Sequence, residues 1–277
     1  MSNAFVQQEA VQKLLREGAG LNVPGGNERF KAIVHRLLEN ICTLIDDYNV
    51  TEEEFWHAVN YLHELGGRQE AALLAAGLGL EHFLDLRQDA IDAAARRETG
   101  TPRTIEGPLY VANAPLADSH ARMDDGTDAG EVMWLHGQVK DNQGQPIANA
   151  IVDIWHANTL GNYSFFDQSQ SDYNLRRRIR TGADGRYSVR SIMPSGYGCP
   201  PDGPTQKLLD QLGRHGNRPA HIHFFVSAPG YKHLTSQINL SGDKYLWDDF
   251  AFATRDGLIA DPVKVSDRGT IAQRDLE

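Results

Sequence analysis

The first hundred residues place apolar side chains at the spacing of an amphipathic helix. From residue 27 to residue 48 they recur every three or four positions, which puts them on one stripe of a helix. That stripe comprises Phe30, Ile33, Val34, Leu37, Leu38, Ile41, Leu44 and Ile45. Asn27 stands at the expected N-cap, and Thr51 with Glu54 predicts a capping box that opens a second helix.

Two more helical segments follow before the pattern changes. One begins near Arg68 and is rich in small residues, which allow helices to pack closely, and a polar helical run extends from Asp89 to Glu98. From about Glu131 the apolar positions alternate, which indicates strands. Turn signals at Asn142–Gly144 and Asp184–Gly185 lie between extended segments.

Two further strands are predicted over residues 218–229 and 233–242. Short strands separated by turns favour an antiparallel sandwich or barrel. We therefore predict an α+β fold, with a helical N-terminal domain (residues 1–105) followed by an antiparallel β-sandwich (residues 106–277). The long glycine- and proline-rich loop over residues 194–214 is of the kind that usually carries function.

Composition narrows the classes of partner. The chain has 277 residues and a formal net charge of -10, so nucleic acid and anionic membranes are disfavoured as partners. No stretch is long and apolar enough to predict a membrane span or a signal peptide, and Cys42 and Cys199 form no CxxC pair. The expectation is a cytoplasmic protein.

His221 and His223 are the clearest candidates for chemistry. Residues two apart on a strand point to the same face, so both imidazoles can bind one metal ion while Ile222, Phe224 and Val226 face a core. Zinc, copper or iron would fit, and two hydrogen-bonded histidines without metal give the same pattern. A tyrosine phenolate would suit Fe(III), but spacing does not tell which of the nine tyrosines would supply it.

The order of longer motifs resembles a known family. Along the chain these motifs are TPRTIEGPLYVANAP, WHANTLGNYSFFD, RSIMPSGYGCPPDGPTQKLLDQLGRHGNRPAHIHFFVSAPGY, LTSQIN and YLWDDFAFATRDGL. Together they resemble the catechol 1,2-dioxygenase family of intradiol ring-cleaving enzymes over nearly the whole chain. The resemblance implies one non-haem Fe(III) ion per subunit, catechol and O2 as substrates, and cis,cis-muconate as the product of a step in aromatic catabolism by the β-ketoadipate pathway.

The resemblance also assigns residues by position. The metal ligands it implies are Tyr163, Tyr197, His221 and His223. It further implies catalytic roles for Arg218, which would stabilise charge developing on the ring, and for Gln237, which would hydrogen-bond to substrate or intermediate. Tyr197 would be the ligand that leaves when catechol binds, because its loop contains flanking glycines. A homodimer through the N-terminal helices and a phospholipid in an apolar tunnel between them are implied as well.

An apolar slot for a flat ring is also expected. The substrate-binding residues implied by the resemblance are Leu73, Ala76, Ile105, Pro108, Leu109, Arg218, Phe250 and Ala251. Plain core packing would account for the apolar members equally well. The small side chain of Ala76 leaves room beside the ring, so a chlorocatechol or hydroxyquinol 1,2-dioxygenase is the alternative within this class. A β-sandwich binding module without metal and a His-x-His cupin are the alternatives from other classes.

Overall fold

The computed structural model describes residues 5–97 and 100–270. Its contacts divide the chain into two compact units, Met1–Glu64 and Leu65–Glu277. Packing therefore separates the chain earlier than the functional boundary expected after residue 105. The assignment of dimerisation to residues 1–105 and of catalysis to residues 106–277 stays a prediction.

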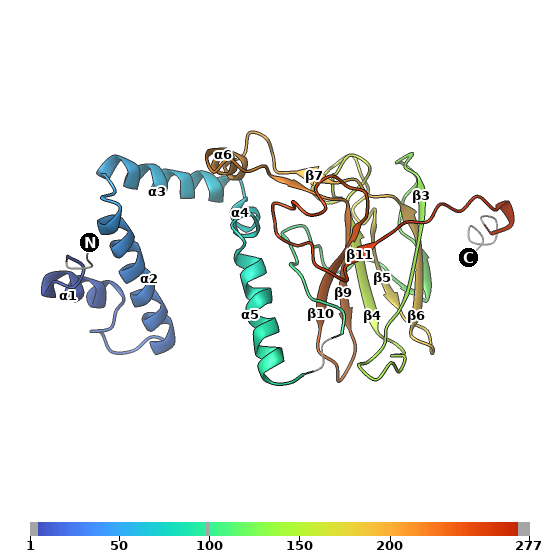
Figure 1. The fold of residues 1–277 in the computed structure, drawn as a ribbon, viewed down its shortest axis with the longest axis horizontal. Coiled ribbons are helices and arrows are strands. Elements are labelled where there is room, and N and C mark those ends of the chain that lie inside the picture. Colours follow the sequence, from blue (N-terminus) through green and yellow to red (C-terminus); the bar gives the residue numbers. More distant parts are fainter. Residues whose placement is uncertain (1–4, 98–99, 271–277) are drawn as a thin grey trace. The chain divides into compact units, whose positions relative to one another are not determined.

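The N-terminal helices begin where the sequence predicts. They are α1 (Glu9–Gly18), α2 (Glu28–Asp47) and α3 (Glu52–Gly67), drawn in blue in Figure 1. The Asn27 side chain accepts a hydrogen bond from the backbone N–H of Phe30 at 2.9 Å, which confirms the N-cap of α2. Glu54 accepts from the Thr51 N–H at 2.8 Å and Thr51 Oγ accepts from the Glu54 N–H at 3.2 Å, which confirms the capping box.

The predicted apolar stripe of α2 forms, but none of the twenty residues of this helix is buried in the single chain. Phe30 is 66% exposed and Leu37 54% exposed. Exposed apolar side chains continue on α3, where Trp56 and Leu62 are examples. A contiguous apolar surface of this kind normally marks an interaction site.

The third predicted helical segment is two helices, not one. The first is α4 (Ala71–Gly77) and the second is α5 (Leu80–Ala94), and they meet at Gly79, whose φ of 74° is left-handed. The polar run expected to be helical from Asp89 to Glu98 is helical only as far as Ala94, where α5 ends, and Glu98 lies outside the described residues. A further helix, α6 (Pro204–Gln211), which the sequence patterns did not predict, lies within the long loop.

The remaining residues of the second unit form sheets. The strands are β1 (Leu116–Asp118), β2 (His120–Arg122), β3 (Val132–Gln138), β4 (Ile151–His156), β5 (Arg176–Arg180), β6 (Arg186–Ile192), β7 (Tyr197–Gly198), β8 (Asn217–Arg218), β9 (His221–Ser227), β10 (Leu234–Leu240) and β11 (Ile259–Ala260). A six-stranded sheet has the order β1-β5-β4-β9-β10-β11, a three-stranded sheet the order β2-β6-β3, and β7 pairs with β8 (Figure 1). The predicted α+β class is confirmed.

The antiparallel expectation holds for the central strands but not for every pair. Strand β9 is antiparallel to both β4 and β10, whereas β1–β5, β2–β6 and β10–β11 are parallel. The two strands on either side of the Asn142–Gly144 turn, β3 and β4, lie in different sheets. The same is true of β5 and β6 around Asp184–Gly185, so both turns carry the chain from one layer to the other.

The core lies between the two sheets. Val152 and Ile154 of β4 pack with Ile222 and Phe224 of β9 and with Val189 of β6. Because side chains alternate along a strand, the intervening residues of β4 and β9 must face the opposite side of the six-stranded sheet. The expectation that Ile222 and Phe224 belong to the core is confirmed, and His221 and His223 are thereby directed away from it.

Helix α5 lies beside this sheet through charged contacts. Three of its carboxylates each meet a basic residue of the sheet or its loops: Asp85 with Arg103 at 2.6 Å, Asp89 with Arg255 at 2.6 Å and Asp92 with Lys232 at 2.7 Å. The apolar residues Phe83, Leu84 and Leu86 of the same helix are at least half exposed. The charged face of α5 is therefore the face that attaches it to the sheet.

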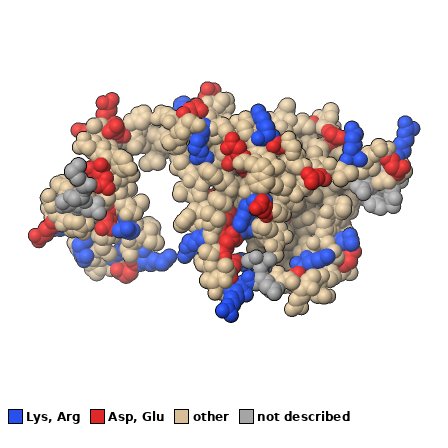
Figure 2. Space-filling view, viewed as in Figure 1, with Lys and Arg blue, Asp and Glu red and all other residues tan. Residues whose placement is uncertain are grey.

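Charged side chains of both signs lie on the surface of the protein. On the face shown in Figure 2, acidic and basic side chains are interspersed, and the described residues there form no large basic patch. Within the described part of the chain, no helix combines the length and the apolar character that crossing a lipid bilayer requires.

Two turn glycines give a matched test of the fold. Gly185 has a φ of 73°, and a Cβ there would lie 2.5 Å from the Val139 carbonyl oxygen, whereas at Gly144, with a φ of 79°, a Cβ would meet nothing within 4 Å. We expect Gly144→Ala to cost only the left-handed backbone penalty of ~1–2 kcal/mol. Gly185→Ala should cost at least ~1 kcal/mol more because of the added clash. Urea unfolding measures both values, and equal losses would contradict this packing.

Candidate active site

His221 and His223 form a buried, neutral imidazole pair. They are 1% and 2% exposed, and their Nε2 atoms lie 3.1 Å apart. His221 Nδ1 lies 2.7 Å from the Pro219 carbonyl oxygen, which only accepts, so Nδ1 carries the hydrogen and Nε2 presents a lone pair. Burial, reinforced by the charge of Arg218, lowers the pKa of His221 to about 3. Burial also lowers the pKa of His223 well below its usual value.

Trp155 holds the plane of His223. The two residues are paired across β4 and β9, and their rings stack at 4.8 Å with an angle of 3°. The indole is 1% exposed, so the stack is shielded from water. Sequence reasoning did not single out Trp155. The sequence nevertheless indicated it, because side chains alternate along β4 and Trp155 therefore points to the face opposite Val152 and Ile154.

Tyr163 approaches the pair from the loop after β4. Its hydroxyl lies 3.5 Å from His221 Nε2, and its side chain is 3% exposed. Burial raises the pKa of Tyr163 well above its usual value, so the phenol is neutral unless a cation is present. Asn158 shapes this loop by accepting hydrogen bonds from the N–H groups of Leu160 and Asn162.

Tyr197 comes from the long loop and meets Tyr163 edge to face. The ring centroids are 5.5 Å apart at 86°. Close approach of the two loops requires Gly161, because a Cβ at that position would lie 2.7 Å from Tyr197 Cβ. The β7–β8 pairing places Tyr197 opposite Arg218, whose Nη1 donates to the Tyr197 hydroxyl at 3.3 Å.

Arg218 is a buried cation with a buried carboxylate partner. Its side chain is 3% exposed, and its Nε lies 3.1 Å from an oxygen of Asp249, which is 1% exposed. Burial acts to lower the pKa of Arg218, but the charge of Asp249 outweighs it and raises that pKa above its usual value. Conversely, burial acts to raise the pKa of Asp249, and Arg218 holds it below the usual value. The pair is therefore ionised.

Gln237 is hydrogen-bonded to Arg218. Its Oε1 accepts from Arg218 Nη2 at 2.8 Å, and its Nε2 donates to Asn239 Oδ1 at 2.7 Å. Gln237 is opposite His223 in the β9–β10 register. The structure thus brings together Tyr163, Tyr197, Arg218, His221 and His223. Gln237 lies on the other side of the Arg218 guanidinium. Asp249 and Asn239 were missed, although Asn239 lies two residues from Gln237 on the same strand face.

The expected slot residues fall into two buried groups. Ala76, Ile105, Phe250 and Ala251 form one cluster with Cys199, Leu209 and Ala253, and Leu73 packs against it. Leu109 packs instead with Trp155 and Tyr163. Pro108 is exposed and belongs to neither cluster. Cys199 is buried, and burial raises its thiol pKa to about 12, so it is protonated. Contact of these residues with a ring stays a prediction.

The donor set fits a hard trivalent cation. Among the described residues, no group of three or more His, Cys, Asp or Glu side chains is arranged to bind a metal ion. Two imidazole nitrogens 3.1 Å apart nevertheless face each other with a tyrosine oxygen beside them. Any metal held by His221 and His223 would therefore need donors of another kind, and the tyrosine oxygen beside them could serve as a phenolate. Phenolates suit Fe(III), whose charge would offset the cost of removing their protons.

A third buried imidazole, that of His156, lies in the core between the two sheets. It ends β4 on the face that packs against the smaller sheet, where its Nε2 lies 2.8 Å from the Ser191 hydroxyl. Its Nδ1 lies 2.7 Å from the Ala157 carbonyl oxygen. Burial lowers the pKa of His156 to about 4, so this histidine is neutral at neutral pH.

Comparisons with known proteins match both parts of the chain. Residues 27–96 match the family described as "Catechol dioxygenase N terminus", and residues 105–275 match the family described as "Dioxygenase". Catechol 1,2-dioxygenase 2 of Acinetobacter lwoffii is 59% identical over 254 residues, which is 92% of each chain. The solved structure of catechol 1,2-dioxygenase from Acinetobacter sp. ADP1, inhibited by bound mercury, has a TM-score of 0.95 and 55% identity, covering 97% of this chain and 88% of that one.

More distant relatives include enzymes for other catechols. Chlorocatechol 1,2-dioxygenase of Cupriavidus pinatubonensis is 36% identical over 84% of this chain and 88% of its own length. Hydroxyquinol 1,2-dioxygenase of Rhizobium sp. is 34% identical over 95% of this chain and 88% of its own length. Both are considerably less similar to this chain than the relative from Acinetobacter lwoffii.

The buried His156 predicts how stability responds to pH. Histidine in the unfolded chain has a pKa near ~6.5, whereas in the folded protein that of His156 is about 4. Between these values only the unfolded state takes up the proton, so stability that is complete above the unfolded pKa is lost as the pH falls. At pH 5 the loss is about 2 kcal/mol.

We therefore expect the unfolding free energy of His156→Asn to fall less steeply from pH 7 to pH 5 than that of the unsubstituted protein. Urea unfolding of metal-free protein across this range measures the slope. His136→Asn, which removes an exposed imidazole, is the matched control. A slope unchanged by His156→Asn would contradict the assignment of His156 as a buried neutral group.

Proposed function

The chain belongs to the catechol 1,2-dioxygenase family of intradiol ring-cleaving enzymes, and we propose that it opens catechol with O2 to give cis,cis-muconate. The reaction would be a step in aromatic-compound catabolism through the β-ketoadipate pathway. The observation that carries this proposal is the convergence of two neutral imidazoles, two tyrosine hydroxyls and one guanidinium in a buried place. A cytoplasmic location stays a prediction.

The cofactor proposed is one non-haem Fe(III) ion per subunit, held by Tyr163, Tyr197, His221 and His223. When bound, such an ion supplies Lewis acidity that lowers the pKa of both catechol hydroxyls and activates the ring toward O2. The two imidazoles are suited to hold it because both are neutral and one Nε2 lone pair is fixed by the bond from Nδ1 to Pro219. The ring of Trp155 stacks on the imidazole of His223 and so fixes the orientation of that second imidazole.

The two tyrosines differ in freedom to move. Tyr163 is 3% exposed and packed against Trp155 and Ala157, so it is proposed to remain in place. Tyr197 is only partly buried and lies between Gly196 and Gly198 on a two-residue strand. We assign to Tyr197 the role of moving away as catechol arrives, with its oxygen taking up a proton released by a catechol hydroxyl.

Arg218 is proposed to stabilise negative charge that develops on the ring. Its Nη1 is directed at the Tyr197 hydroxyl and at His221 Nε2, so it faces the position that a substrate oxygen would occupy. A buried guanidinium that is already oriented needs no reorganisation during reaction, which is the basis of electrostatic catalysis. Gln237 supports this group through Oε1.

Catechol is favoured over its substituted relatives. The chain is more similar to catechol 1,2-dioxygenases than to the chlorocatechol and hydroxyquinol enzymes. Of the residues expected in the slot, Leu73, Ala76, Ile105, Phe250 and Ala251 lie in one cluster, and their side chains are apolar. Such a slot binds a flat ring and gives no hydrogen bond to the third hydroxyl of hydroxyquinol. Relative turnover of catechol, 4-chlorocatechol and hydroxyquinol tests this preference.

A homodimer through the N-terminal helices is also proposed. The support for it is the exposed apolar surface of α2 and α3, which a second copy of the chain would cover. A phospholipid in an apolar tunnel at this interface would be compatible with the same side chains.

The visible spectrum tests the metal site. Iron-loaded protein should be coloured by tyrosinate-to-Fe(III) charge transfer, and anaerobic catechol should change the band. Tyr163→Phe and Tyr197→Phe should each shift or bleach it, since each removes one proposed ligand. Tyr187→Phe, which removes a hydroxyl from β6 in the other layer, is the control and should keep the band.

Two results would separate the alternatives. Protein that stays colourless and inactive after iron loading would support a β-sandwich binding module. An active, iron-containing enzyme whose spectrum is unaffected by both ligand substitutions would instead contradict tyrosine ligation and favour a cupin-like site completed by other donors.

The proposed dimer predicts the effect of one charge on α2. Leu37→Glu places a carboxylate in the exposed apolar stripe and should convert dimer to monomer at micromolar concentration, because a buried unpaired charge is strongly unfavourable. Light scattering after size exclusion measures the mass. Val263→Glu, at a residue that is 84% exposed in the second unit, is the control. A dimer that survives Leu37→Glu unchanged would place the interface elsewhere.

A further inference from the structure

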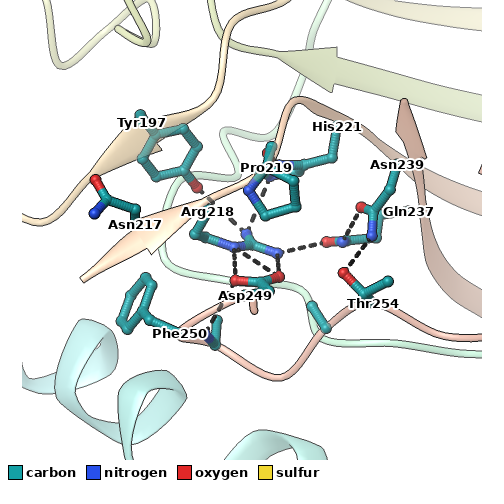
Figure 3. A network of polar contacts seen from close by, with 12 residues as sticks. Tyr197, Asn217, Arg218, Pro219, His221, Gln237, Asn239, Asp249, Phe250 and Thr254 are labelled. Atoms are coloured by element: carbon teal, nitrogen blue, oxygen red, sulfur yellow. Dashed lines mark hydrogen bonds and ion pairs between the residues drawn. The ribbon is translucent and has the colours of Figure 1, made fainter. Parts of the chain in front are cut away.

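A chain of hydrogen-bonded side chains, all buried except the half-buried Thr254, extends from Arg218 in two directions (Figure 3). On one side is the carboxylate of Asp249, which accepts from Nε and from Nη2 of the guanidinium, each at 3.1 Å. On the other side, Nη2 donates to Gln237, which donates to Asn239 at 2.7 Å. Asn239 in turn donates to the Thr254 hydroxyl at 2.6 Å.

The donors and acceptors of this chain have a single consistent direction. A guanidinium only donates, so the Gln237 atom that meets it must be the oxygen, and its NH2 group must point to Asn239. The Asn239 oxygen then accepts, and its NH2 group points to Thr254. The amide orientations of Gln237 and Asn239 are therefore set by Arg218, and the Thr254 hydroxyl accepts at the end of the chain.

Only one nitrogen of Arg218 is left to face the imidazoles. Asp249 and Gln237 take up Nε and Nη2, and Nη1 contacts the Tyr197 hydroxyl at 3.3 Å and His221 Nε2 at 3.1 Å. An arginine side chain has several rotatable bonds, so this orientation depends on the groups that hold its other nitrogens. Asp249 is the only one of these groups that carries a charge.

The same carboxylate also holds a turn. Oδ1 of Asp249 accepts from the backbone N–H of Ala251 at 3.0 Å, and the Phe252 N–H donates to the Asp249 carbonyl oxygen at 2.9 Å. This turn carries Phe250 and Ala251, which are buried in the cluster proposed as the ring slot. One side chain thus contacts both the guanidinium and the backbone of the slot.

We propose that Asp249 is a positioning residue with two separable roles: its charge and geometry orient Arg218 toward the substrate oxygen, and its Oδ1 fixes the turn that forms one wall of the slot. The proposal rests on the proposed catechol cleavage. It assigns no contact between Asp249 and substrate, so every effect of Asp249 on kcat passes through Arg218.

Substitutions at Asp249 separate the two roles. Asp249→Asn keeps an oxygen that can accept from Ala251 but removes the charge, so kcat should fall ~10- to 100-fold with little change in KM. Asp249→Ala removes the turn bond as well, so KM for catechol should also rise. In a crystal structure of iron-free Asp249→Asn, the Arg218 guanidinium should leave its wild-type position, which is a readout independent of activity.

Asp249→Asn leaves a buried cation without its partner and could prevent folding, so a second variant is needed. Asp249→Glu keeps the ion pair and moves the carboxylate by one methylene group. Because a small misplacement of a catalytic group is costly, kcat should still fall. Wild-type kcat and KM in Asp249→Glu would show that Asp249 acts by charge alone and would overturn the positioning role.

A double-substitution cycle tests the route through Arg218. In an Arg218→Gln background, adding Asp249→Asn should cause little further loss of kcat, since the group that Asp249 orients is gone. An equal loss in both backgrounds would show that Asp249 acts by another route. The control is Asp124→Asn, which removes the charge of a buried carboxylate that pairs with the more exposed Arg122 and Arg190 elsewhere in the sandwich. It should leave kcat and KM unchanged.

The outcomes distinguish this proposal from the function on which it rests. If the unsubstituted, iron-loaded protein does not cleave catechol, the proposed function fails and the role of Asp249 fails with it. If that protein is active and Asp249→Asn matches it in kcat and in the position of Arg218, only the role of Asp249 is wrong. A loss of kcat in Asp124→Asn as large as in Asp249→Asn would attribute both effects to general destabilisation.

Discussion

Successive side chains of β9 point to opposite faces of the six-stranded sheet, and this alternation determines where everything else can lie. Ile222 and Phe224 enter the sandwich core, so His221 and His223 are committed to the other face. The neighbouring strands supply what lies beside them: Trp155 from β4 and Gln237 from β10. A shift of one residue in this register would turn the histidines into the sandwich core and would turn Ile222 and Phe224 to the face of the site.

Burial on that face makes the protonation states of the side chains interdependent. The imidazoles and the Tyr163 phenol are held neutral by lack of solvent, while Arg218 keeps its charge because Asp249 is next to it. Arg218 and Asp249 form an ion pair at this site, and the guanidinium carbon of Arg176 lies 5.7 Å from the centroid of the Tyr163 ring. A bound cation would therefore meet two lone-pair donors ready for it, and it would have to supply the energy that deprotonates the tyrosines.

Local signals in the sequence were sufficient for helix starts and for the faces of strands. Asn27, Thr51 and Glu54 act through neighbours three residues away, and alternation located the histidine pair. Pairing between distant strands was not accessible in this way, so the placement of β3 and β4 in different sheets and the parallel edge pairs were not predicted. The tyrosine ligands and Arg218 came from resemblance, because nothing local distinguishes them from other tyrosines and arginines.

The contact of Asp249 with Arg218 also could not be predicted from local sequence patterns. Asp249 lies within a motif that carried the resemblance, in the loop between β10 and β11, yet its partner Arg218 is 31 residues away on β8. Only the folded structure reveals that the two are in contact. Trp155, by contrast, could have been found from strand alternation alone, since it is a large aromatic residue on the face that the histidines share.

Helix α5 inverts the usual arrangement of a surface helix. Its carboxylates are directed inward to basic partners, and its aromatic and aliphatic side chains are directed outward. Such a helix gains little from hydrophobic burial within its own chain. A newly made copy would therefore tend to associate with other apolar surfaces until these side chains are covered. The concentration of the protein would then affect its solubility before it affects its catalytic activity.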